Sequence, residues 1–99
     1  MSVPGHRPYA QVLWVRNPDV MTRSGAFGVL VLAPNGDRPL LLEGTGINLW
    51  RALSAPKSAA QLAADLADQY GVEITVVEPD VHEALEQLRA GAIVVPAEP

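Results

Sequence analysis

The sequence predicts an α+β fold in which short helices lie on one face of a small antiparallel sheet. Two observations predict it. Extended apolar segments separated by turn signals fill the chain up to residue 42, and amphipathic helical patterns follow. Strands that precede helices, instead of alternating with them, are typical of α+β proteins. Three short helices joined by tight turns also resemble a helix-turn-helix unit.

Length and composition describe one folded domain. The 99 residues are 48% apolar and 18% charged, which suits a chain with a single modest core. No cysteine is present, so disulfides, zinc–thiolate sites and thiol catalysis are excluded. Met1–Pro8 holds two prolines and a glycine and is expected to be a loose arm, which leaves residues 9–99 as the domain.

No segment has the character of a membrane anchor. The longest apolar stretch, Phe27–Ala33, is far shorter than the roughly 18 to 20 residues that span a bilayer. The N-terminal residues also lack the apolar core of a signal peptide. We therefore expect a cytoplasmic protein with no membrane association.

Four extended segments are expected before the helices. Gln11–Val15 and Val20–Ser24 are short, and Phe27–Leu32 is β-branched and apolar like a buried strand. Asn35-Gly36 predicts a tight hairpin, because both residues tolerate positive φ. The returning strand, Leu40–Leu42, carries leucines on both faces because side chains alternate at period two, which raises the question of what covers its second face.

The first two helices are predicted from residue spacing and capping signals. Gly46–Leu53 reads as a short helix, and Ala59–Tyr70 as a longer one. Ser58 and Gln61 have the spacing of a capping box, and Gly71 suits a left-handed C′ position. The expected apolar stripe of the longer helix consists of Leu62, Ala63, Leu66, Ala67 and Tyr70.

A third helix is predicted between a proline and a glycine. The preceding "VEITVVE" reads as an extended connection, Pro79 suits position N1 and Gly91 suits C′. Asp80 and Glu83 would then lie in the first turn, where the helix dipole favours negative charge. Ala92–Val95 is an apolar tail that packs back or pairs as a strand. The expected apolar stripe consists of Val81, Leu85 and Leu88.

Side chains that could carry chemistry are few. His6 lies in the expected arm and His82 lies off the apolar stripe, so neither has a second imidazole at metal-site spacing. Gly44-Thr45-Gly46 precedes a helix but lacks the lysine and third glycine of nucleotide-binding loops, so a plain strand-to-helix turn is favoured. We expect no enzyme activity, no cofactor and no metal.

The charge distribution argues against nucleic acid as a partner. The net charge is −4, and the segment Lys57–Arg89, where a recognition helix would lie, holds two basic and seven acidic residues. Such a surface repels phosphate, whose neutralisation supplies most non-specific affinity.

The helical half of the chain resembles a known family. The stretches "LLLEGTGINLWRALSAPKSAAQLAADLADQY" and "DVHEALEQLRAGAIV" are similar to the PqqD-like proteins, also called RiPP recognition elements, which bind leader peptides of ribosomally made, modified peptides. The match covers roughly the last three-fifths of the chain. The residues that carry it are Leu49, Trp50, Leu53, Pro56, Ser58, Leu62, Ala63, Leu66, Ala67, Tyr70, Asp80, Val81, Leu85, Leu88 and Gly91.

The resemblance implies a winged helix-turn-helix-like fold, in which a three-stranded antiparallel sheet packs on three helices. It also implies a non-catalytic, free-standing module. Such a module binds a precursor leader peptide as an added strand in a groove walled by the last helix. It then delivers that peptide to a maturation enzyme, which could be a leader protease, a cyclase or a radical S-adenosylmethionine enzyme. A lasso-peptide pathway is the favoured setting.

The physics of strand addition agrees with this mode of binding, since a free sheet edge offers unpaired N–H and C=O groups to an incoming peptide. Acidic residues of the last helix, including Glu86, would meet basic leader residues at the rim. The expected peptide-binding residues are Leu40, Leu41, Leu42, Asp80, Val81, Glu83, Ala84, Leu85 and Leu88. Two alternatives remain open: a winged-helix DNA-binding regulator, and a structural module that forms homodimers by pairing its edge strands.

Overall fold

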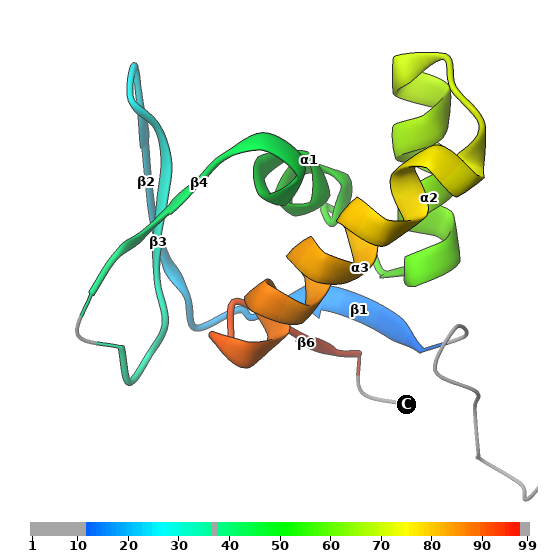
Figure 1. The fold of residues 1–99 in the computed structure, drawn as a ribbon. Coiled ribbons are helices and arrows are strands. Elements are labelled where there is room, and N and C mark those ends of the chain that lie inside the picture. The colour runs from blue at the N-terminus through cyan, green and yellow to red at the C-terminus, as the bar shows by residue number, and fades with distance from the viewer. Residues whose placement is uncertain (1–11, 37, 98–99) are drawn as a thin grey trace, which may run out of the picture.

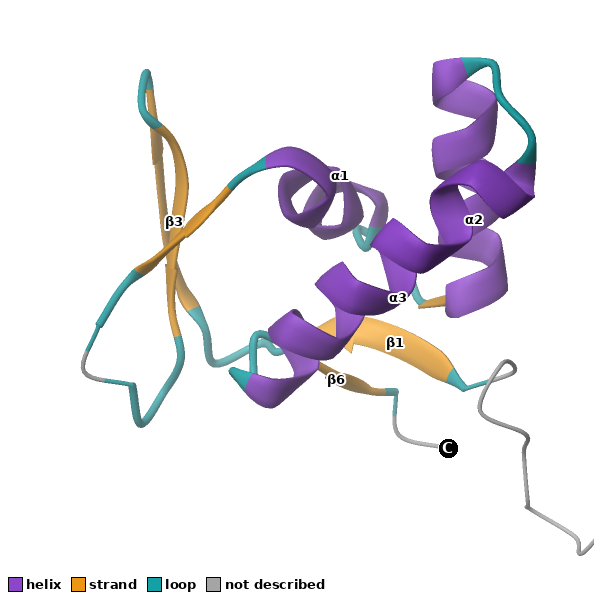
Figure 2. Ribbon diagram, viewed as in Figure 1, coloured by secondary structure: helices purple, strands orange, loops and turns teal. Residues whose placement is uncertain are grey.

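The computed structural model describes residues 12–36 and 38–97, so the predicted arm and His6 lie outside the described residues. Three helices and two small antiparallel sheets make up the fold (Figures 1 and 2). In chain order the elements are β1 (Leu13–Arg16), β2 (Met21–Gly25), β3 (Gly28–Leu32), β4 (Leu40–Leu42), α1 (Gly44–Ala52), β5 (Lys57–Ser58), α2 (Ala59–Tyr70), α3 (Ile74–Ala90) and β6 (Val94–Pro96).

The α+β class and the three helices are confirmed, and a second sheet joins the predicted one. The first sheet has the order β2-β3-β4 and stands at one end of the molecule, with α2 at the other end (Figure 1). The second has the order β5-β1-β6, so the apolar tail returns to pair with the first strand. With only two to four residues in each of its strands, the second sheet leaves no periodic pattern in the sequence.

The hairpin between β3 and β4 reverses the chain by a different turn from the one predicted. The amide of Gly36 donates to the carbonyl of Ala33 at 2.9 Å, which puts Pro34 and Asn35 at the centre of the turn. Neither Asn35 nor Gly36 adopts a positive φ. The predicted tight Asn-Gly turn is therefore wrong, because Pro34 already supplies the φ that a turn centre needs.

One apolar core joins the helices to both sheets. Val29 and Val31 of β3 point from the first sheet into this core, while all five residues of β2 are exposed. Val94 of β6 lies fully buried beneath the helices. The buried core residues are Trp14, Val29, Val31, Leu42, Leu49, Trp50, Leu53, Ala59, Leu62, Ala63, Leu66, Ala67, Val77, Val81, Leu85, Leu88, Ile93 and Val94.

Helix α2 forms with the predicted bounds and caps. Ser58 Oγ accepts from the amide of Gln61 at 3.1 Å, and Gln61 Oε1 accepts from the amide of Ser58 at 2.9 Å, which completes the capping box. Gly71 has a φ of 67° and ends the helix in the left-handed conformation. Tyr70 was wrongly placed in the stripe: it is 51% exposed, and its hydroxyl accepts a 2.7 Å hydrogen bond from Asn48 Nδ2.

Helix α3 begins five residues earlier than predicted. It starts at Ile74, so "VEITVVE" is mostly helical and Pro79 lies inside the helix, not at N1. Asp80 and Glu83 consequently lie beyond the first turn. The helix extends backwards because Val77, four residues before Val81, continues the buried stripe.

The end of α3 also differs from the prediction by one residue. The helix ends at Ala90, and Gly91 has an ordinary φ of −86°. Ala92 adopts the left-handed conformation with a φ of 58°. The amide of Ile93 donates to the carbonyl of Leu88 at 2.9 Å and that of Ala92 to Arg89 at 3.0 Å, which is a Schellman motif with alanine at C′.

Candidate functional site

The β4 strand forms one edge of the first sheet. Among the described residues it pairs only with β3, in the register Val29↔Leu42, Leu30↔Leu41 and Val31↔Leu40. Its outer side therefore offers backbone N–H and C=O groups that no described strand takes up.

The register divides the three leucines between the two faces of the sheet. Leu40 and Leu42 share the face of Val31 and Val29, which is turned towards the helices, whereas Leu41 lies on the opposite face beside Leu30. Leu42 is buried in the core, and Leu40 is 44% exposed. The helix-facing side of β4 thus has one leucine in the core and one open to solvent.

A cavity of about 260 Å³ lies between β4 and α3. The strand contributes its three leucines, and the helix contributes Ala84, Gln87 and Leu88. Glu43 and Gly46, which follow the strand, also line it. The cavity runs along a free sheet edge, so an extended chain laid against β4 would place side chains in it.

An acidic cavity of about 200 Å³ adjoins the apolar one. Glu43, Asp80 and Glu83 line it, together with Thr45 and Gln87. The ion pairs given by the described residues join Lys57 to Asp65 and Arg89 to Glu86, and neither involves these three carboxylates. Glu43 also makes no capping hydrogen bond to α1.

Glu86 has a different role from the other acidic residues of α3. Arg89, one turn later, donates to both of its carboxylate oxygens, and this hydrogen bonding lowers the pKa of Glu86. Glu86 lines neither cavity. Glu86 is therefore paired within α3 and lies outside the groove, where the predicted contact with a basic peptide residue would have been made.

The predicted site residues separate into groove and core. Val81 and Leu85 are 0% exposed and line neither cavity, so they belong to the core and not to the groove. The residues that do line one or both cavities are Leu40, Leu41, Leu42, Asp80, Glu83, Ala84 and Leu88.

Sequence reasoning missed Glu43, Thr45, Gly46 and Gln87, which the structure adds to this groove. Gln87 is one helical turn beyond Glu83 and could have been found from that spacing. Glu43, the N-cap of α1, and Thr45 and Gly46, in its first turn, could not be found in this way, because their position depends on how β4 meets α1.

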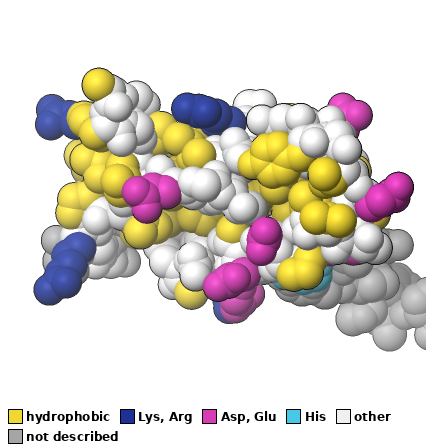
Figure 3. All heavy atoms as spheres, turned by 45° about the horizontal axis from the view of Figure 1, so that its top comes forward, with side chains coloured by type: hydrophobic (Ala, Val, Ile, Leu, Met, Phe, Trp, Pro, Cys, Tyr) yellow, Lys and Arg dark blue, Asp and Glu magenta, His cyan; other side chains and the backbone are white. Residues whose placement is uncertain are grey.

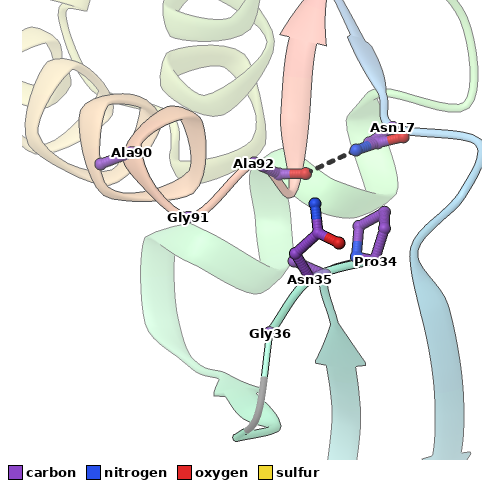
Figure 4. Close-up of a pocket in the computed structure, with 8 residues that line it drawn as sticks. Asn17, Pro34, Asn35, Gly36, Ala90, Gly91 and Ala92 are labelled. Carbon is purple, nitrogen blue, oxygen red and sulfur yellow. Dashed lines mark hydrogen bonds between the residues drawn. The ribbon is translucent and has the colours of Figure 1, made fainter.

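A separate cavity of about 340 Å³ lies where the β3–β4 turn approaches the end of α3 (Figure 4). Asn17 Nδ2 donates to the carbonyl of Ala92 at 2.8 Å at its border, and the Asn17 amide donates to Ile93 at 2.9 Å. The side chain of Asn35 points towards the same place from the turn (Figure 4). These bonds fix the segment that leads into β2 against the end of α3, and they position the first sheet relative to the helix.

Other candidate features carry no site. His82 is exposed on α3, and the described residues contain no group of three or more His, Asp or Glu side chains that could hold a metal. Within the described part of the chain, no helix combines the length and the apolar character that crossing a membrane requires. Exposed apolar side chains gather over the first sheet and, separately, where α2 meets α3 (Figure 3); the latter are Tyr70, Val72, Ile74 and Val76.

Comparison with known proteins gives one family and two similar structures. A family model described as coenzyme PQQ synthesis protein D (PqqD) matches residues 28–94, more than half of the chain. No curated protein matches in sequence.

The first similar structure is a lasso peptide synthetase B1 complexed with the leader peptide, with a TM-score of 0.66 and 23% identity over 84% of this chain and 98% of that one. The second is the solution structure of the PqqD truncation of Methylobacterium extorquens PqqCD, described as a stand-alone RiPP recognition element. Its TM-score is 0.68, with 17% identity over 87% of this chain and 92% of that one. At these identities both establish a shared fold.

Proposed function

The chain belongs to the coenzyme PQQ synthesis protein D family, and from this premise we propose that it is a recognition module without catalysis of its own. It binds the leader segment of a ribosomally made precursor peptide by strand addition and delivers it to a maturation enzyme.

The observation that carries this proposal is the unpaired β4 edge with a cavity between it and α3. Strand addition obtains affinity from main-chain hydrogen bonds and specificity from pockets for alternate side chains. The groove offers both the free main-chain groups of β4 and a cavity for side chains in one place. Of the two similar structures, one is a complex with a leader peptide and the other is a RiPP recognition element, which supports a leader peptide as the ligand.

The finer parts of the proposal concern the pathway. A lasso-type precursor is favoured, because one of the similar proteins is a lasso peptide synthetase component. The partner would be a leader protease, a cyclase or a radical S-adenosylmethionine enzyme. A precursor gene next to the gene for this chain would identify which of these applies.

The test is a titration of this protein into fluorescently labelled leader peptides of the precursors encoded beside its gene. We expect a dissociation constant in the low micromolar range or below for one of them. Failure of every neighbouring precursor to bind would reject the proposed function.

A pair of variants locates the binding site. Leu40→Lys puts a charge on the helix-facing side of β4 and should weaken binding by about tenfold or more, because an apolar contact of the groove is lost. Met21→Lys makes a comparable change on the other edge strand, where Met21 is 69% exposed, and should leave binding within about twofold. Equal losses in both variants would show that β4 is not the docking edge.

A further inference from the structure

We propose that the groove selects a side-chain pattern in the peptide that pairs with β4: a Lys or Arg followed, two positions later, by an aliphatic residue. This inference rests on the proposed function above, and it adds the chemistry that would distinguish one peptide from another.

The spacing follows from the two cavities and the helix that lines both. The acidic and apolar cavities share Glu43, Gly46, Ala84 and Gln87, so they are neighbours along one groove. Asp80 lines the acidic cavity, Ala84 lines both, and Leu88 lines the apolar one.

Four residues of helix rise about 6 Å, and two residues of strand rise about 6.6 to 6.8 Å. The helix residues of the apolar cavity, Ala84, Gln87 and Leu88, each lie four residues after Asp80, Glu83 and Ala84 of the acidic cavity. The two cavities are therefore offset by about two residues of an extended peptide that lies alongside α3. One side chain enters the acidic cavity, and the side chain two positions away enters the apolar one.

The apolar cavity is suited to an aliphatic side chain. Its walls are Leu40 and Leu42 from the strand and Leu88 from the helix, with only Glu43 and Gln87 as polar side chains at the edge. An aliphatic side chain placed between these walls would bury apolar surface against them.

The acidic cavity is suited to a cation. Glu43 approaches from the end of β4, and Asp80 and Glu83 approach from α3, so three carboxylates from two elements face one space. No ion pair given by the described residues involves any of the three. A Lys or Arg side chain would bring a counter-charge to this space, and the same carboxylates would reject an acidic peptide residue.

The direction of the pattern follows from the sheet. Every described pairing in the first sheet is antiparallel, and antiparallel pairing is slightly more stable per residue. β4 runs from the apolar cavity towards Glu43 and the acidic cavity. An antiparallel peptide runs the other way, so its basic residue comes first in the sequence.

The experiment is a selection from a displayed library of random decapeptides on the immobilised full-length protein. Wild-type protein should enrich peptides with Lys or Arg two positions before Leu, Ile, Val or Met. Glu83→Lys should remove the preference for the basic residue and weaken a selected wild-type peptide by about tenfold. Glu78→Lys makes the same charge change on the same helix outside both cavities, and should retain the preference and an affinity within about twofold.

Circular dichroism of each variant checks that the fold is kept, and Glu83→Gln supplies a milder second variant that should give a partial loss. Three results would count against us, each in a different way. In the first, the selected peptides lack the basic–aliphatic pair, yet the Leu40→Lys variant no longer binds them. This result would overturn the inference about the pattern and leave the proposed function standing. The pair in reversed order would overturn the antiparallel assignment. No enriched peptide, together with no binding of any neighbouring precursor, would overturn the proposed function itself.

Discussion

Ala92 shows how packing decides the conformation of a single residue. A residue after a helix that adopts the left-handed conformation is usually glycine, and Gly91 stands next to this position. However, Leu88 and Ile93 are both buried, and the hydrogen bond between them closes the Schellman motif. That bond spans Ala92 and leaves Gly91 one position too early, so the sequence pattern alone suggests the wrong residue.

Replacing Ala92 with glycine is therefore expected to stabilise the protein. The left-handed conformation costs a non-glycine residue about 1 kcal/mol or more, and glycine avoids most of this cost. Ala90→Gly, at the last residue of α3, is the matched control and should destabilise the fold by up to about 1 kcal/mol. Urea unfolding would measure both changes, and a lower free energy of unfolding for Ala92→Gly would contradict this account.

At the scale of elements, α3 is where local signals and tertiary packing disagree most. Its first residues, "ITVV", are β-branched, and Pro79 normally marks a helix start, so local preference favours a strand followed by a helix. Val77 and Val81 are both buried and lie four residues apart, so a helix places them in one continuous apolar stripe against α2 and α1. This burial outweighs the local preference for a strand. Packing of this kind routinely overrides propensity.

Pro79 should accordingly lower the free energy of unfolding, because it lies inside α3. Its nitrogen cannot donate to the carbonyl of Thr75, and its ring crowds the preceding turn. Pro79→Ala is expected to raise the free energy of unfolding by about 1 to 3 kcal/mol. Pro56→Ala, in the exposed connection before β5, should lower it by up to about 1 kcal/mol, because there proline only restricts the unfolded chain. Thermal unfolding of both variants tests the contrast, and equal shifts would refute it.

Helices and strands that depend on residues close together in the sequence can be predicted from it. Strands that form only by pairing with a distant segment cannot. The bounds of α2 and its capping box follow from the sequence because Ser58, Gln61 and Gly71 act within a few residues. The second sheet does not, since β5 and β6 exist only because each pairs with β1. The groove was half predictable: β4 and α3 were identified, but which leucines face it depends on strand register, and Glu43 enters it only through the turn into α1.

At the scale of the whole molecule, the architecture and the charge give opposite indications about DNA. Three helices beside a projecting sheet are like a winged helix-turn-helix protein (Figure 1). The net charge is −4, however, and the segment from Lys57 to Arg89, which holds α2 and α3, has seven acidic residues against two basic ones. One of the two basic residues, Lys57, is already paired with Asp65, and the other, Arg89, with Glu86.

We therefore predict that this protein will not retard duplex DNA in a gel-shift assay, even at about 50 mM salt, where non-specific binding is much stronger than at physiological salt. A basic winged-helix protein of similar size serves as the positive control. The physical reason is that phosphate contacts need free cations, and the helices that would enter a groove offer carboxylates instead. Retardation at micromolar protein that weakens steeply with salt would mean that a surface other than α2 and α3 binds phosphate. It would also return the regulator hypothesis to consideration. The same excess of carboxylates that excludes DNA is, at Glu43, Asp80 and Glu83, the feature that would attract a basic peptide.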